Sequence, residues 1–150
     1  MTNNKRRSGF TLVEVLIVVV IMAVLAATII PQFSDSSKDA KVSSAKFNLH
    51  TLRSQIQLYK SQHDGKLPGD DLAELLLTTN TAGTTDSGDG PLVYGPYIQS
   101  IPVNPFTGSA TVAEITNDPA VAGDVTSTDG WLYNKTAGQV WINHADYLSE

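Results

Sequence analysis

The chain has 150 residues, a formal charge of −5 and no cysteine. The lack of cysteine excludes disulfides, thiol catalysis and Cys-ligated metals, so stability must come from packing, from neighbours or from bound ions. The acidic balance argues against a nucleic-acid-binding surface, and the length suits one small domain beside any membrane segment.

The most informative segment is an apolar run, residues 10–30, that follows the basic residues Lys5, Arg6 and Arg7. As a helix rising about 1.5 Å per residue, the run would cover roughly 30 Å, the thickness of a bilayer's hydrocarbon core. Its one charged residue is Glu14. An ionised carboxylate in an apolar helix is costly unless it is paired, and the run contains no cation. We therefore expect a membrane helix whose Glu14 meets a cation from another chain.

Three other interpretations of the run explain less. A secretory signal peptide has a shorter apolar core and a small-residue cleavage site after it. An ordinary single-pass anchor fits the length and the basic residues before it, but it gives no reason for Glu14. A buried helix of a soluble domain seldom contains so long an apolar run.

Residues 31–64 predict an amphipathic continuation of the same helix. Apolar residues recur at intervals of 3 and 4, which places them on one stripe, and Gly65 and Pro68 then give a stop signal. The whole helix would approach about 50 residues, a length that calls for lateral partners such as those in a filament. The stripe, expected to pack on the rest of the domain, consists of Val42, Ala45, Leu49, Leu52, Ile56 and Tyr59.

The remaining residues, 65–150, predict a small globular region. Residues 70–77, from Asp70 to Leu77, are expected to form a short helix, and residues 78–90, with almost nothing to bury, a loop. Residues 95–108 contain three prolines that exclude a regular helix, so we expect an extended segment on the long helix, and then a second polar loop at 117–129. The anchors of the extended segment would be Tyr97, Ile98, Ile101, Val103 and Phe106.

The segment from Trp131 to Ile142 predicts a β-hairpin, because two aromatic-rich runs flank a turn that contains glycine. Side chains alternate along a strand, so the pair Trp131 and Tyr133 and the pair Val140 and Ile142 can each occupy one strand face, whereas Trp141 then falls on the other face. The expected fold is α+β, with a long N-terminal helix packed on a small antiparallel hairpin or sheet.

Six consecutive residues resemble the processing motif of type IV pilins and of type II secretion pseudopilins: Gly9-Phe10-Thr11-Leu12-Val13-Glu14. The resemblance implies that residues 1–9 are a leader peptide, which a prepilin peptidase removes by cutting between Gly9 and Phe10. Phe10 would then become the N-methylated amino terminus, and Glu14 would meet the terminal amine of a neighbouring subunit during assembly. Pro31 matches the helix-bending proline of the family.

The segment at 95–108 and the hairpin after it resemble the C-terminal domain of major pseudopilins. The resemblance implies a type IV pilin-like fold and divides the chain into a leader (1–9), a transmembrane assembly helix (10–30), an amphipathic helix (31–64) and a globular region (65–150). The subunit would sit in the inner membrane with its C-terminal domain in the periplasm. Its implied partners are copies of itself, the prepilin peptidase, minor pseudopilins and the inner-membrane assembly platform, with no nucleic acid.

The favoured function is that of a structural subunit of a type II secretion pseudopilus, which helps to export folded proteins. A type IV pilus subunit, major or minor, that serves adhesion, motility or DNA uptake at the cell surface is the first alternative. The small domain without a C-terminal disulfide loop favours the pseudopilus. A monomeric, membrane-anchored periplasmic binding module is the alternative of another class, and it predicts that Glu14 is dispensable.

No enzyme is expected, because His50, His63 and His144 stand in no recognised catalytic or metal-binding spacing. Major pseudopilins commonly bind calcium in an acidic C-terminal loop, and oxygen ligands of the kind calcium prefers occur here too. The Asp-rich sequence of that loop does not align with this chain, so the expectation is a solvated loop with no cofactor. The oxygen-bearing residues considered are Asn117, Asp118, Asp124, Asp129 and Asp146.

Overall fold

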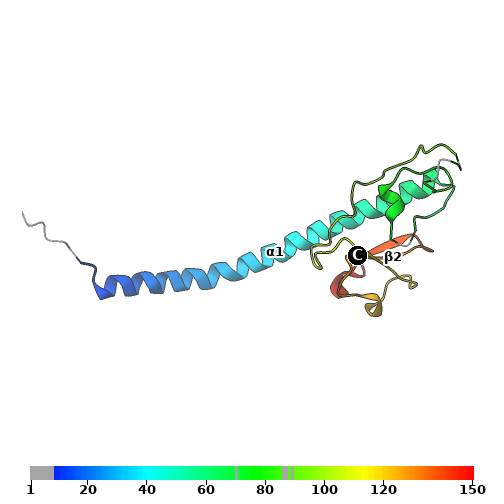
Figure 1. Ribbon diagram of the computed structural model, residues 1–150. Coiled ribbons are helices and arrows are strands. Elements are labelled where there is room, and N and C mark those ends of the chain that lie inside the picture. Colours follow the sequence, from blue (N-terminus) through cyan, green and yellow to red (C-terminus); the bar gives the residue numbers. More distant parts are fainter. Residues whose placement is uncertain (1–8, 70, 86–87, 89) are drawn as a thin grey trace, which may run out of the picture. The chain divides into compact units, whose positions relative to one another are not determined.

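The computed structural model describes two compact units, Met1–Ala40 and Lys41–Glu150 (Figure 1). Outside the description lie residues 1–8, 70, 86, 87 and 89 and the side chains of residues 30–35. The predicted leader, with its three basic residues, therefore lies outside the described residues except for Gly9.

One helix, α1 (Leu12–Gln62), runs through 51 residues and contributes to both units. Its backbone stays helical through Pro31, so the proline does not end the helix. The helix ends near the predicted stop, where Asp64 and Gly65 adopt left-handed backbone angles (φ 52° and 83°). The Gly65 amide donates to the Lys60 carbonyl at 2.9 Å, which closes the last turn.

The second half of α1 carries the predicted stripe into the core of the second unit. Val42, at the start of the stripe, is half-buried. The five residues after it expose 2% of their surface or less: Ala45, Leu49, Leu52, Ile56 and Tyr59. They share one cluster with two leucines and four sheet residues: Leu72, Leu75, Trp131, Tyr133, Val140 and Ile142. Burial of a large apolar side chain contributes about 1.5–3 kcal/mol, so this contact is the main source of the unit's stability.

The predicted hairpin is confirmed as β2 (Trp131–Asn134) and β3 (Gln139–Ile142), which pair antiparallel. Both predicted pairs, Trp131 with Tyr133 and Val140 with Ile142, lie on the face of the sheet that belongs to the main cluster. Trp141 packs on the other face with Leu132, in a smaller cluster. Gly138, at φ 69°, occupies the turn, where a left-handed backbone favours glycine.

A third strand, β1 (Val112–Glu114), is not predicted from the sequence. It pairs parallel with β2, so the sheet has the order β1-β2-β3 and is mixed, not purely antiparallel as expected. Three residues are too few to show a clear alternation. A parallel pair also needs a long crossover, which the residues between β1 and β2 supply. Tertiary structure, more than local propensity, makes these residues a strand.

The short helix predicted at residues 70–77 is reduced to a 3-10 turn, η1 (Ala73–Leu76), and Asp70 lies outside the described residues. Leu72, directly before η1, has a φ of 59°, which an α-helix does not allow. In this conformation Leu72 and Leu75 are both fully buried. Short 3-10 turns also form at η3 (Ala122–Asp124) and η4 (Ala145–Tyr147).

The expectation that residues 78–90 bury almost nothing is wrong at Thr79 and Asn80, which are fully buried. The Thr79 amide donates to the Tyr94 carbonyl at 2.8 Å, and Asn80 Oδ1 accepts from the Thr84 amide at 3.0 Å. Polar residues are accommodated in a core when their hydrogen bonds are satisfied. Composition alone does not indicate which polar residues these are.

The segment at 95–108 is anchored on α1 as predicted. The Tyr97 hydroxyl donates to Gln62 Oε1 at 2.7 Å, and Asn48 Nδ2 donates to the Val103 carbonyl at 3.2 Å. The prediction that the Val103 side chain is an anchor is wrong, because the residue is 54% exposed. Val103 is attached to α1 through its backbone carbonyl instead. The other predicted anchors pack against the main cluster: Tyr97, Ile98, Ile101 and Phe106.

Candidate assembly site

The first turn of α1 holds the principal candidate group, the Glu14 carboxylate. Its Oε2 accepts hydrogen bonds from the Thr11 amide at 2.8 Å and from the Thr11 hydroxyl at 2.9 Å. The same hydroxyl oxygen accepts from the Glu14 amide at 3.2 Å. This reciprocal pattern is a capping box, which satisfies amides that the first helical turn leaves without partners. Glu14 therefore fixes the start of the helix as well as carrying charge.

Thr11 belongs to the motif from Gly9 to Glu14, but no role of its own is predicted for it from the sequence. A signal for it exists in Thr11-Leu12-Val13-Glu14, because threonine followed three residues later by glutamate is the signature of a capping box. Among the described residues, no basic group forms an ion pair with Glu14. Within the described part of the chain, only two groups donate hydrogen bonds to the Glu14 carboxylate, and both belong to Thr11: its amide and its hydroxyl.

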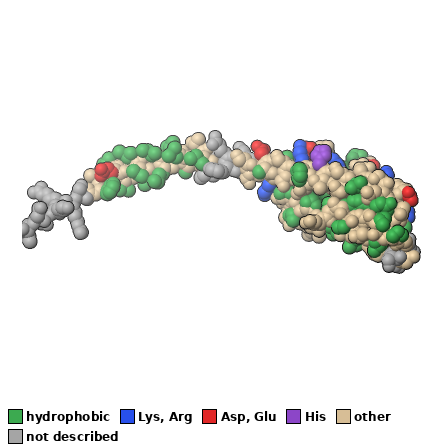
Figure 2. Space-filling view, turned by 90° about the horizontal axis from the view of Figure 1, so that it is seen from above, with side chains coloured by type: hydrophobic (Ala, Val, Ile, Leu, Met, Phe, Trp, Pro, Cys, Tyr) green, Lys and Arg blue, Asp and Glu red, His purple; other side chains and the backbone are tan. Residues whose placement is uncertain are grey.

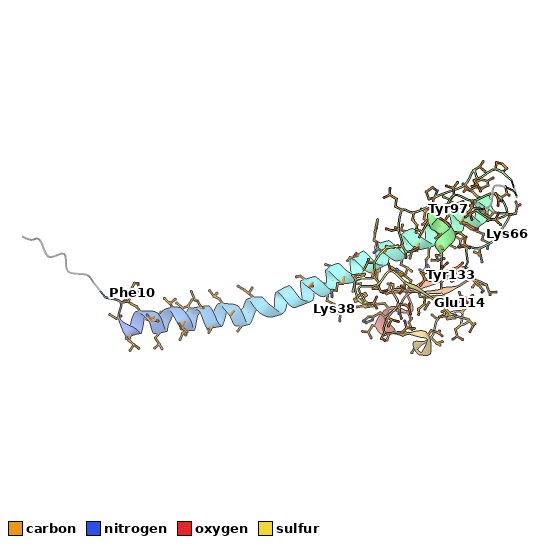
Figure 3. The ribbon with its side chains drawn as sticks, viewed as in Figure 1. Phe10, Lys38, Lys66, Tyr97, Glu114 and Tyr133 are labelled. Carbon is orange, nitrogen blue, oxygen red and sulfur yellow. The ribbon has the colours of Figure 1, made fainter. Side chains whose placement is uncertain are left out.

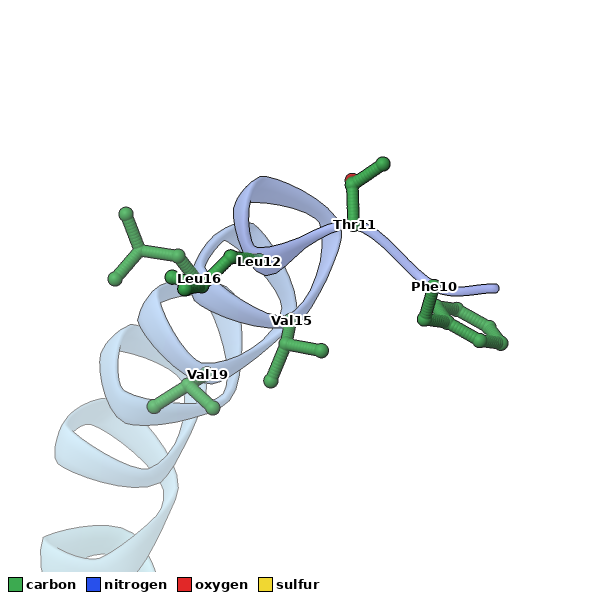
Figure 4. A pocket seen from close by; sticks show the side chains of 6 residues that line it. All are labelled: Phe10, Thr11, Leu12, Val15, Leu16 and Val19. Carbon is green, nitrogen blue, oxygen red and sulfur yellow. The ribbon is translucent and has the colours of Figure 1, made fainter. Parts of the chain in front are cut away.

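An apolar groove of about 480 Å³ lies beside the capping box. Figure 4 shows its lining, in which Thr11 is the one polar residue beside Phe10, Leu12, Val15, Leu16 and Val19. Phe10 is 87% exposed. An apolar surface of this kind normally marks contact with lipid or with another chain.

The apolar part of α1 has the length and composition of a membrane span. Over Leu12–Ile29 the mean hydropathy is 3.0 and no residue is buried. The apolar residues run consecutively, so they lie on every side of the helix, and Figure 2 shows hydrophobic side chains along the face in view. A helix that is apolar on all sides has no polar face to present to water, so it needs an apolar environment on every side.

The structure brings three of the four predicted site residues together. Gly9 and Phe10 directly precede the capping box that contains Glu14, whereas Pro31 lies in the helical backbone beyond the apolar segment. A Cβ built on Gly9 would meet no atom within 4 Å, so local packing does not require glycine there. The roles of these residues in cleavage, methylation and assembly stay predictions.

The loop at 117–129 contains most of the oxygen ligands considered for calcium. Asp124 accepts two hydrogen bonds from the Asn117 amide group, at 2.8 and 3.1 Å, while Asp146 lies 3.9 Å from the His144 ring nitrogen. Within the part of the chain that the structure describes, no three His, Cys, Asp or Glu side chains are placed to hold a metal ion.

Asp129 ties this loop to the strand region before it. Its carboxylate accepts hydrogen bonds from the Thr126 and Thr111 hydroxyls at 2.8 and 2.9 Å and from Thr128 at 3.3 Å. These bonds, that of Thr126 first and that of Thr111 second, hold the pKa of the Asp129 carboxyl below its usual value. The loop is therefore ordered by its own side chains.

His63 is the one histidine that the structure buries completely. Its Nδ1 lies 2.8 Å from the Tyr59 carbonyl, which can only accept, so Nδ1 donates, while Nε2 makes a hydrogen bond with the Thr79 hydroxyl at 2.9 Å. The ring also stacks on Tyr59 at 3.8 Å. His63 thus fastens the end of α1 to the residues after η1, whereas His50 is exposed.

Comparison with known proteins gives matches at both the motif and the chain level. Residues 4–30 match the prokaryotic N-terminal methylation motif. Type II secretion system core protein G of Pseudomonas aeruginosa is 30% identical over 105 residues, which cover 68% of this chain and 70% of that protein. A fimbrial protein of Neisseria meningitidis serogroup A is 28% identical over 139 residues, or 93% of this chain and 74% of the relative.

The type IV major pilin protein PilA of Myxococcus xanthus is 43% identical over 61 residues, which cover 41% of this chain and 28% of the relative. No solved structure gives a significant match. None of these relatives carries the name of an enzyme.

A methylation motif at the start of one long helix, followed by a small α+β domain, defines the pilin-like class of protein. The chain belongs to the type IV pilin-like family, which includes the type II secretion pseudopilins and the type IV pilins.

Proposed function

We propose that this chain is the precursor of a type II secretion pseudopilus subunit. A prepilin peptidase cuts between Gly9 and Phe10 and methylates the new amino terminus, and the mature subunits polymerise through α1 to help export folded proteins. The observation that carries the proposal is the similarity to core protein G, which covers about two thirds of both chains and so extends beyond α1 into the globular region.

In the proposed filament, Glu14 exchanges its capping partner for the amine of Phe10 in a neighbouring subunit. A carboxylate in an apolar environment gains most from a full positive charge, and removing one partner of a buried pair costs about 3–5 kcal/mol. Before assembly the capping box satisfies the same carboxylate with two Thr11 donors. The subunit then waits in the inner membrane, with the globular region in the periplasm because the basic leader stays in the cytoplasm.

The central test replaces Glu14 with glutamine. The amount of filament recovered by shearing after overexpression should fall at least about tenfold, which corresponds to a loss of about 1.4 kcal/mol in each contact between subunits. Membrane insertion and cleavage should remain normal. Asp39→Asn is the matched control, because it removes one exposed carboxylate of α1 outside the apolar segment. Normal filaments from Glu14→Gln, or none from the unaltered chain, would refute the proposal and favour the monomeric binding module.

Processing has its own test at Gly9. Mass spectrometry of the mature chain should find an N-methylated Phe10 as the first residue. Gly9→Val should leave the fold unchanged, since a Cβ there meets no atom within 4 Å, and any loss of cleavage then reports recognition by the peptidase. An intact Met1, or a cut within the apolar segment, contradicts the assignment.

A type IV pilus subunit is the second candidate, because fimbrial and pilin proteins are also among the relatives. Deletion of the chain in its own bacterium separates the two. A pseudopilus subunit predicts that secreted enzymes accumulate in the periplasm while surface pili persist, and a pilus subunit predicts the reverse. No cofactor is part of either proposal.

A further inference from the structure

The two outer edges of the sheet differ in how their backbone groups are satisfied. At the β3 edge, Arg53 of α1 donates from Nε and Nη2 to the Val140 carbonyl at 3.2 and 3.0 Å. The Ile142 carbonyl, two residues further on, accepts from the His144 amide at 2.8 Å. The outward carbonyls of β3 are therefore occupied by the chain itself.

At the β1 edge, the residues that the structure describes give no such cover. Thr111 and Ile115 bond to β2, since the Thr111 carbonyl accepts from Trp131 at 3.1 Å and the Ile115 amide donates to Tyr133 at 2.8 Å. Because bonding residues alternate along a strand, the amides and carbonyls of Val112 and Glu114 point away from β2. Among the described residues none of these four groups has a hydrogen-bond partner. An unpaired strand edge is a template for another extended chain.

A pocket of about 410 Å³ lies at the carboxyl end of this edge, where the parallel strands β1 and β2 both finish. Its lining includes Glu114, Asp118 and the buried Asn134. Asn134 Nδ2 donates to the carbonyls of Thr116 and Asn117, both at 3.1 Å, so the amide holds the wall of the pocket in place. Figure 3 labels Glu114 and Tyr133, which are partners in the β1–β2 register.

The charge of the pocket is negative. Lys135 pairs with Glu114 at 2.9 Å, but the exposed Asp118 carboxylate has no ion pair among the described residues. Residues 63–150 carry 12 Asp and Glu against 2 Lys and Arg. A cationic side chain arriving along the β1 edge would therefore be attracted to the pocket.

We propose that the β1 edge surface, formed by the free backbone groups of Val112 and Glu114 and the pocket beside Asp118, binds an extended basic segment of a different protein. A second copy of this chain does not offer such a segment. Beyond residues 1–9, five of its seven Lys and Arg residues lie on α1. The other two are Lys66, which donates to the Ala82 carbonyl, and Lys135. The surface is independent of the assembly role of α1.

The test uses the full processed chain in a non-ionic detergent and fluorescein-labelled peptides of the sequence Gly-Lys-Val-Thr-Val-Lys-Gly. Fluorescence anisotropy should show saturable binding, and the same peptide with both lysines replaced by glutamates should bind at least about tenfold more weakly. N-methylation of alternate peptide amides should abolish binding for one alternating set and leave it nearly unchanged for the other, because only one edge of a strand pairs. This arm leaves the protein unaltered.

Variants of the chain give the complementary arm. Val112→Pro removes an outward N–H that no ladder bond uses, which an edge strand tolerates, and should weaken binding at least about tenfold. Val112→Thr keeps the N–H and is its control. Asp118→Asn should weaken binding of the lysine peptide and reduce its salt dependence, whereas Asp146→Asn, an exposed carboxylate at another site, should not.

Several results would overturn the proposal. These are no binding of the lysine peptide up to about 1 mM, equal binding of the lysine and glutamate peptides, or equal effects of the two N-methylated sets. Unchanged binding by Val112→Pro with native tryptophan fluorescence would also refute it. Sedimentation of the chain without peptide tests whether a second copy binds the edge instead. A dimer that Val112→Pro dissociates would assign the edge to a second copy of this chain.

Discussion

The two halves of α1 use hydrophobic residues in opposite ways. In the first half, Leu12–Ile29, apolar residues cover every side of the helix and none is buried within the chain. In the second half they form a stripe, and the residues from Ala45 to Tyr59 on it are almost completely buried. The periodicity of the apolar residues, more than their number, decides whether a helix forms a core of its own or depends on lipid and neighbours.

Charged residues show the same contrast. Among the described residues, the single charge of the first half, Glu14, is satisfied only by Thr11 of its own turn. Arg53 in the second half reaches 87 and 97 residues along the sequence, to the Val140 and Glu150 carbonyls at 3.0 and 2.7 Å. Its half of the helix is therefore joined to the domain by polar contacts as well as by the stripe.

The two halves of α1 should differ most in how a leucine-to-alanine substitution changes the free energy of unfolding. Leu52→Ala should lower the free energy of unfolding of the globular region by about 2–5 kcal/mol, because it leaves a cavity in the core. Leu16→Ala, at a position that is 59% exposed, should leave that free energy unchanged within about 0.5 kcal/mol. Both tryptophans lie in the sheet, so denaturation in detergent followed by their fluorescence reports this region alone. Equal losses in the two variants would contradict the contrast.

A smaller effect is expected from the polar contacts of the second half. Arg53→Met keeps most of the apolar stem but leaves the Val140 and Glu150 carbonyls without their donor, so unfolding should become easier by about 1–3 kcal/mol. Lys60→Met, at an exposed position on the same helix, serves as the control and should change stability by less than about 0.5 kcal/mol. If the two variants unfold alike, the Arg53 contacts contribute nothing measurable.

The smallest expected effect is the contribution of Asp129 to stability, which depends on pH. The pKa of Asp129 is lowered by its threonine donors, so its contribution to stability is present above the unfolded value, near pH 4, and is lost as pH falls through the folded pKa. Asp129 is partly exposed, so solvent screens its contacts, and Asp129→Asn should lower the free energy of unfolding at pH 7 by less than about 1 kcal/mol. The variant should also lose less stability than the unaltered chain between pH 5 and about pH 2. An unchanged acid profile would show that the threonine contacts are not maintained in solution.

The regions with a regular pattern are those that the sequence predicts well. Spacings of 3 and 4 predict the stripe from Ala45 to Tyr59, and alternation predicts the faces of β2 and β3, because both patterns are local. The candidate site is also largely predictable, since the motif from Gly9 to Glu14 is contiguous.

The features missed by sequence prediction depend on distant residues. β1 exists only because β2 pairs with it, and Thr79 is buried only because His63 and Tyr94 satisfy its polar groups. Leu72 leaves the helical conformation because burial in the core outweighs local propensity. Thr11 is the exception, since its capping pattern is local and visible in the sequence.

The distance along the chain between the stripe and the strands that cover it sets an order of events during synthesis. About 70 residues separate Tyr59 from Trp131, and a ribosome adds roughly 5–20 residues each second. For several seconds, on the order of 4–14, the finished stripe has no strand to pack against. During this interval the nascent chain presents two apolar surfaces, one permanent and one temporary, so a chaperone or the membrane itself must shield the second until the hairpin arrives.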